Sequence, residues 1–217
     1  MTASRLVLIA AILAGTTYVG SWFIPGLPPA ASTVWKGAGV ALLALWAAMN
    51  ARGLDGWLIS VVLAFGALGD VLLETHGLVV GALAFLAGHL TAIGLYLKNR
   101  QRPLAARDMA FAVALIPVVV TVAYLLPPER NGAGLVALYA LGLISMASAA
   151  WVSRFPRALV ATGALMFVAS DLLIFARTGR PQFDTFFMGL GVWGLYFAGQ
   201  AFIALGVVRT LRQPAQG

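Results

Sequence analysis

The sequence predicts an all-α integral membrane protein, a polytopic bundle of eight transmembrane helices. Of its 217 residues, 61% are hydrophobic and only 10% are charged, and the mean hydropathy is +0.94. Soluble globular domains do not have this composition. The apolar residues also form runs of about 17 to 25 residues, the length that crosses roughly 30 Å of hydrocarbon.

Each run predicts one helix, and turn residues mark each break. The expected helices are at about 5–24, 33–50, 56–74, 78–97, 108–126, 132–152, 157–176 and 184–208. The breaks carry proline, glycine or asparagine, as in 25–29, 52–53, 75–77, 101–103, 127–132, 154–156 and 178–181. Loops this short join antiparallel neighbours, so we expect residues 1–217 to form a single transmembrane domain.

The first run reads as a retained helix. It starts at Arg5 and lacks the small-residue cleavage pattern of a secretory signal peptide. The chain has no cysteine, so neither a disulfide nor a thiolate site is expected.

The net charge of +7 follows the membrane topology. The basic residues lie between apolar runs, so we expect contact with lipid headgroups and no nucleic-acid partner. Ten lie on the side of the two termini and four on the other side, which predicts cytoplasmic termini in a bacterial inner membrane. The ten are Arg5, Arg52, Lys98, Arg100, Arg102, Arg107, Arg154, Arg157, Arg209 and Arg212; the four are Lys36, Arg130, Arg177 and Arg180.

A faint internal repeat links the two halves of the chain. Residues 69–73 (Gly-Asp-Val-Leu-Leu) resemble 170–174 (Ser-Asp-Leu-Leu-Ile), and Gly-Leu-Tyr occurs at 94–96 and 194–196. An offset of four helices predicts a parallel 4+4 repeat whose two aspartates face each other. Chance similarity between apolar segments is the alternative.

Two acidic residues fall inside apolar runs. Asp70 and Asp171 are each expected about 12 or 13 residues, or roughly 18 to 20 Å, from the cytoplasmic end of a helix. A charge at that depth costs at least about 2.5 to 3.5 kcal/mol, so each aspartate predicts a functional cavity. The alternative is a hydrogen bond that only joins helices. The remaining loop-side acids, expected to be satisfied at helix ends, are Asp55, Asp108, Glu129 and Asp184.

Other polar residues extend the predicted site. Glu74 lies one turn after Asp70 on the same face, either at a cavity mouth or in solvent. His89 is expected near mid-membrane facing the aspartates, or else as a packed core histidine. Lys36 lies near the outer surface, where it either reaches the headgroups or binds a phosphate.

Tyrosine and glutamine on two later helices complete the set. Tyr196 and Gln200 share one helix face, and Tyr139 and Met146 share another. A buried tyrosine and glutamine need hydrogen-bond partners. Ser170 points about 100° away from its neighbour Asp171 around the helix.

Neither a metal nor a serine nucleophile is expected. The chain has two histidines and no His-Glu-x-x-His spacing, so we expect no metal and no other cofactor. Gly-x-Ser-x-Gly is also absent.

Several of these segments, in order, resemble a known family. They are residues 69–73, 81–89, 116–118, 139–146, 163–171 and 196–200. Over about residues 36–203 the chain resembles the YhhN-like membrane proteins, which include the eukaryotic lysoplasmalogenases. It departs from the family pattern at Phe197 and Ala92, where the family often has tyrosine.

The resemblance implies hydrolysis of the vinyl-ether bond of a lysoplasmalogen to a fatty aldehyde and a glycerophospho-headgroup. This chemistry needs a protonated acid and a carboxylate that stabilises an oxocarbenium ion, roles that Asp70 and Asp171 divide in an order the sequence leaves open. We expect His89, Tyr196 and Gln200 to orient water, with Tyr139 and Ser170 supporting them.

Lys36 and Glu74 are expected to receive the headgroup, so the predicted partners are a lysophospholipid and membrane lipids. The alternatives are a proton-coupled transporter, a hydrolase of another lyso-lipid, or a scaffold without catalysis. The oligomeric state stays open.

Overall fold

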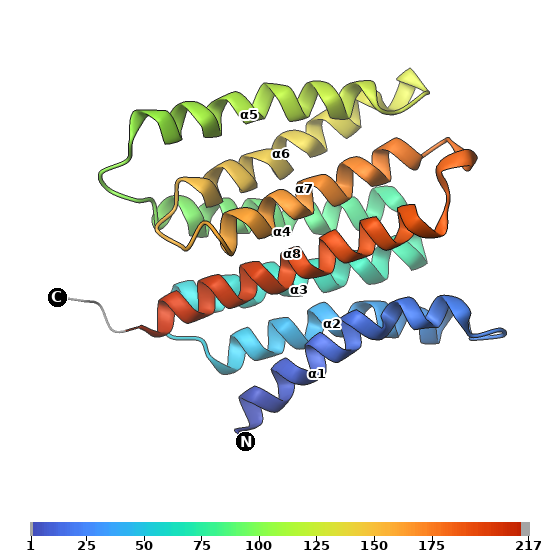
Figure 1. Ribbon diagram of the computed structural model, residues 1–217, viewed down its shortest axis with the longest axis horizontal. Helices are drawn as coiled ribbons and strands as arrows, with labels where there is room; N and C mark the ends of the chain where they lie inside the picture. Colours follow the sequence, from blue (N-terminus) through green and yellow to red (C-terminus); the bar gives the residue numbers. More distant parts are fainter. Residues whose placement is uncertain (1, 214–217) are drawn as a thin grey trace. The chain divides into compact units, whose positions relative to one another are not determined.

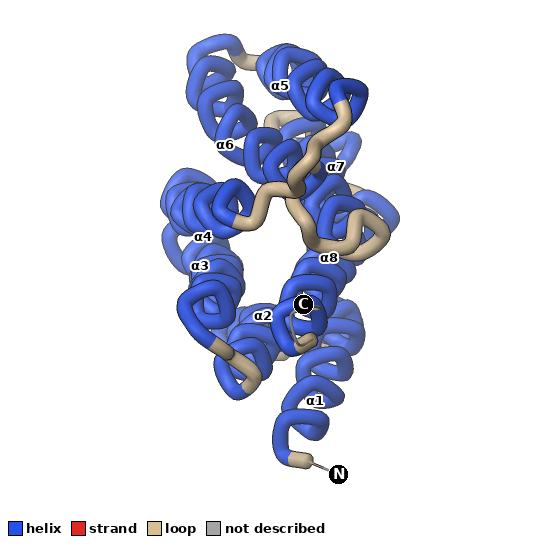
Figure 2. Tube along the Cα trace, turned by 90° about the vertical axis from the view of Figure 1, so that its left-hand side faces the viewer, coloured by secondary structure: helices blue, strands red, loops and turns tan. Residues whose placement is uncertain are grey.

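The computed structural model describes residues 2–213 as a chain of helices (Figure 1). The α-helices are α1 Ala3–Thr17, α2 Pro29–Met49, α3 Gly53–His76, α4 Leu78–Lys98, α5 Ala106–Leu125, α6 Ala133–Trp151, α7 Val160–Arg177 and α8 Phe186–Arg212. Short 3-10 helices are η1 Tyr18–Phe23, η2 Arg130–Gly132 and η3 Pro181–Phe183. Within residues 2–213 there is no β-strand, and Figure 2 shows only helix and loop. The all-α prediction is confirmed.

The helix ends lie close to the predicted ones. The largest difference at a start is in α2, which begins at Pro29 rather than near residue 33. A proline is well suited to the first turn of a helix, where its missing N–H is not needed. Over the described residues eight helical segments are long and apolar enough to cross a membrane. The chain is therefore an integral membrane protein.

The chain forms two compact units. The first comprises Met1–Leu95 and Ala204–Gly217, and the second comprises Tyr96–Ile203. The divisions fall inside α4 and α8, close to the boundary between the two predicted four-helix halves. The internal repeat remains a prediction.

In the first unit, small residues let the helices approach closely. Figure 1 shows α1, α2 and α3 side by side, and α2 packs against both of its neighbours. A Cβ atom on Gly69 of α3 would lie 2.6 Å from the ring of Phe85 on α4. The buried hydroxyl of Ser60 on α3 donates to the carbonyl oxygen of Ala44 on α2 at 2.9 Å. Such contacts hold membrane helices together where the hydrophobic effect does not.

The second unit uses the same principle. Helix α6 packs against both α5 and α7. A Cβ atom on Gly163 of α7 would lie 2.6 Å from the carbonyl oxygen of Gly199 on α8, and the reverse distance is also 2.6 Å. The Ser148 hydroxyl donates to the carbonyl oxygen of Ala112 at 2.8 Å and joins α6 to α5. These contacts fix the helices that carry Asp171 and its neighbours.

Candidate active site

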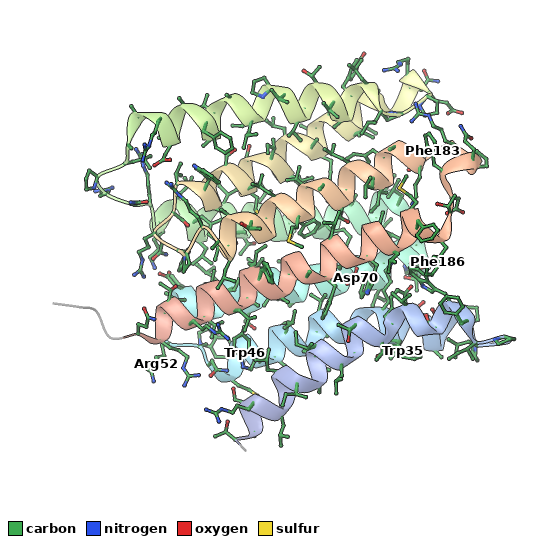
Figure 3. The ribbon with its side chains drawn as sticks, viewed as in Figure 1. Trp35, Trp46, Arg52, Asp70, Phe183 and Phe186 are labelled. Carbon is green, nitrogen blue, oxygen red and sulfur yellow. The ribbon has the colours of Figure 1, made fainter. Side chains whose placement is uncertain are left out.

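Asp70 is buried on α3 in the first unit, with 2% of its surface exposed. Figure 3 shows it far along the helix from Arg52, which precedes the first residue. Because α3 starts at Gly53, earlier than predicted, Asp70 lies about 25 Å from that start and about 9 Å from the end at His76. It is thus closer to the outer end of α3 than the sequence predicted.

Asp171 is buried on α7 in the second unit, with 6% of its surface exposed. The Tyr139 hydroxyl on α6 donates a hydrogen bond to Asp171 Oδ2 at 2.6 Å. The Tyr139 ring packs edge-on against Phe175 with ring centroids 5.8 Å apart. An O–H···O distance this short is typical of a hydrogen bond to an ionised carboxylate. Tyr139 was a predicted site residue, but its bond to Asp171 was not predicted.

The two aspartates occupy equivalent positions in their own helices. Asp70 lies six residues before the last residue of α3, and Asp171 lies six residues before the last residue of α7. Both helices are odd-numbered along the chain, so in a bundle whose helices each cross once they run in the same direction. The predicted match in depth is confirmed relative to the C-terminal ends of the two helices.

Lys36 and Glu74 form an ion pair between α2 and α3. Lys36 Nζ donates to Glu74 Oε1, and the two side chains are 14% and 39% exposed. Glu74 lies one helical turn after the buried Asp70. The sequence analysis considered each residue separately and missed the pair. The ion pair places two opposite charges near the end of α3 that is closest to Asp70.

His89 lies on the buried face of α4. Its exposed fraction is 3%, and Phe85 and Ala92 on the same face are 9% and 1% exposed. The prediction of a buried histidine is confirmed. The first unit therefore contains one buried aspartate, one buried histidine and the partly exposed ion pair.

Tyr196 and Gln200 lie on α8 in the second unit. They are 4% and 2% exposed, so the predicted buried face is confirmed. The Tyr196 ring makes an edge contact with Phe167 of α7, with centroids 5.0 Å apart. The Ser170 hydroxyl donates to the carbonyl oxygen of Val192 at 2.9 Å, so Ser170 joins α7 to α8.

The nine predicted site residues fall into two groups, one in each unit. Lys36, Asp70, Glu74 and His89 belong to the first unit, and Tyr139, Ser170, Asp171, Tyr196 and Gln200 belong to the second. Among residues 2–213, no group of three or more histidine, aspartate or glutamate side chains is arranged to hold a metal ion.

Comparison with known proteins identifies the family. The sequence profile of the YhhN family matches residues 31–207, a range that includes all nine site residues. A protein of Mycobacterium bovis named lysoplasmalogenase is 31% identical over 183 residues, covering 79% of this chain and 68% of that protein. A protein of Mycobacterium tuberculosis with the same name is similar to the same extent. No solved structure matches the chain. The chain belongs to the YhhN family.

Proposed function

We propose that the protein is an intramembrane hydrolase that cleaves the vinyl-ether bond of a lysoplasmalogen. The observation that carries this proposal is the pair of buried aspartates, each six residues before the end of its helix. Membrane-embedded carboxyl groups are rare because they are costly, and they mark functional sites. The names of the two mycobacterial relatives support the choice of substrate.

The reaction needs one proton donor and one carboxylate. The acid transfers its proton to the β-carbon of the vinyl ether, and the resulting oxocarbenium ion is attacked at the α-carbon by water. The carboxylate takes a proton from that water. The hemiacetal then breaks its bond to the glycerol oxygen, which is protonated, so the products are a fatty aldehyde and a glycerophospho-headgroup. Paired carboxyl groups divide these roles around a similar transition state in glycosidases.

Tyr139 favours one assignment of the two roles. Its hydroxyl donates to Asp171 over 2.6 Å, which stabilises Asp171 as a carboxylate. Asp171 is then the group that stabilises the oxocarbenium ion and accepts the proton of water. Asp70 is the acid that protonates the β-carbon.

The remaining site residues position the reactants. His89, Tyr196 and Gln200 are buried and polar, and they orient water and the two aspartates. Ser170 holds α7 against α8 through its bond to Val192 and thereby positions Asp171.

Lys36 and Glu74 receive the headgroup. In this step they exchange their mutual ion pair for the phosphate and the amine of the lipid. With both termini in the cytoplasm of a bacterium, this pair and the two aspartates lie toward the outer side of the inner membrane. The headgroup then binds at the outer surface while the alkenyl chain stays between helices.

Aldehyde release tests the proposal. The purified protein is incubated in detergent with a lysoplasmalogen, and aldehyde is measured with a coupled dehydrogenase. Wild type is expected to release aldehyde, while Asp70→Asn and Asp171→Asn, which keep the size of the side chain, are expected to be folded and inactive. Folded wild type that releases no aldehyde, or a folded Asn variant with full activity, would refute the proposal.

A further inference from the structure

The end of the second unit that precedes α7 carries a concentration of positive charge. Two loops meet there, the α4–α5 loop after Lys98 and the α6–α7 loop after Trp151. They pair through the bridge between Arg100 and Ser153 and through the bond from the Gln101 N–H to the Val152 carbonyl oxygen at 2.9 Å. The basic residues of these loops and the adjoining helix start are Lys98, Arg100, Arg102, Arg107, Arg154 and Arg157.

The one acidic residue at this end is already neutralised. Asp108 Oδ1 accepts from Arg157 Nη1 at 3.0 Å, and Asp108 Oδ2 lies 2.9 Å from Arg157 Nη2. This two-pronged ion pair leaves five positive charges without a carboxylate in either loop. The sequence analysis expected Asp108 to be satisfied by water or by a helix start, and that expectation is wrong because Arg157 pairs with it.

Arg154 is held in a fixed position within this surface. Its backbone N–H donates to the Asn99 carbonyl oxygen at 2.8 Å, and its Nε donates to Asn99 Oδ1 at 2.8 Å. Its guanidinium also lies over the ring of Phe155, 5.6 Å from the centroid. Asn99 and Phe155 are buried, whereas Arg154 is exposed.

Two exposed arginines therefore have donor groups to spare. Neither Nη atom of Arg154 makes a hydrogen bond to any residue from 2 to 213, and within the same range the Arg100 side chain has no hydrogen bond or ion pair. The positive-inside pattern explains why this side is basic, but it does not require an arginine fixed by a buried asparagine. A planar guanidinium with two free donors matches the geometry of a phosphate.

We propose that Arg100 and Arg154 form a binding site for the phosphate group of an anionic phospholipid of the surrounding bilayer. Because the loops adjoin the ends of transmembrane helices, they lie at the level of the lipid headgroups. Basic clusters at this level bind anionic lipids in membrane proteins. Lys98, Arg102 and Arg107 strengthen the local field. The site is at the opposite end of α7 from the proposed headgroup site of the substrate and does not depend on the hydrolase activity.

Native mass spectrometry of the full-length protein with added phosphatidylglycerol or phosphatidylcholine tests this site. We expect wild type to retain phosphatidylglycerol in preference to phosphatidylcholine. Arg100→Gln should weaken phosphatidylglycerol binding roughly fivefold, and the double variant with Arg154→Gln roughly 25-fold, at about 1 kcal/mol per arginine. Arg154→Lys keeps the charge but loses the fork, so it should bind more weakly than wild type and more tightly than the double variant.

Arg180→Gln is the matched control. Arg180 is also held by a carbonyl oxygen, that of Ala176 at 2.9 Å, and lies over the ring of Phe183, but at the other end of α7. This variant is expected to bind phosphatidylglycerol as wild type does. Unchanged binding in the double variant, or an equal loss in the Arg180 control, would overturn the proposal. Because Arg100 has no side-chain partner to lose, Arg100→Gln remains decisive if the double variant does not fold.

Discussion

Replacing Tyr139 by phenylalanine tests the assignment of Asp171 as the carboxylate. The change removes only the hydroxyl that donates to Asp171 Oδ2 at 2.6 Å. A hydrogen bond to a charged group contributes about 1.5 to 3 kcal/mol, so kcat should fall roughly 10- to 150-fold if the bond acts in the transition state. The ring can keep its edge contact with Phe175, so the fold should survive.

The assay for Tyr139→Phe is the rate of aldehyde release at saturating lysoplasmalogen, together with the melting temperature in detergent. Tyr124→Phe is the control, because Tyr124 is 44% exposed on α5 and lies outside the proposed site. It should leave kcat unchanged. A folded Tyr139→Phe variant whose kcat stays within about twofold of wild type would refute the proposed role of this bond.

Three further changes have defined outcomes. Lys36→Met removes the ion pair with Glu74 and should raise KM for the lyso-lipid roughly fivefold with little change in kcat; a lower kcat at constant KM in steady-state kinetics would contradict a headgroup role. Gly163→Ala places a Cβ atom against α8 and should cost about 1 to 3 kcal/mol, seen as a lower melting temperature, whereas Gly194→Ala, with no atom within 4 Å of the new Cβ, should not. Ser60→Ala removes a buried hydrogen bond and should lower the free energy of unfolding by about 1 kcal/mol, which denaturant titration in detergent measures. A melting temperature unchanged by Gly163→Ala, or a free energy of unfolding unchanged by Ser60→Ala, would contradict the packing described for its helix pair.

The helices and the buried aspartates were predictable from sequence because each is a local signal. A run of about 20 apolar residues specifies a membrane helix wherever it packs, and a carboxyl group inside such a run stands out. Asp70 and Asp171 were identified in this way, and both are buried. The exact depth of Asp70 was not predicted because it depends on where α3 begins.

Contacts between helices were harder to predict because a single sequence does not give the rotation of one helix against another. The bond between Tyr139 and Asp171 and the ion pair between Arg157 and Asp108 join residues 32 and 49 positions apart. The Lys36–Glu74 pair had a usable signal, since α2 and α3 form a hairpin with a short turn. Residues at similar distances from that turn meet, as those two do.

Hydrolysis in heavy water, with mass spectrometry of the products, tests the central claim most directly. The proposed mechanism transfers a proton to the β-carbon of the vinyl ether, so wild type in D₂O should release aldehyde with one deuterium on the carbon next to the carbonyl. Asp70→Asn, which lacks the proposed acid, should release none. Aldehyde without deuterium, or deuterated aldehyde formed at the wild-type rate by Asp70→Asn, would contradict protonation by Asp70.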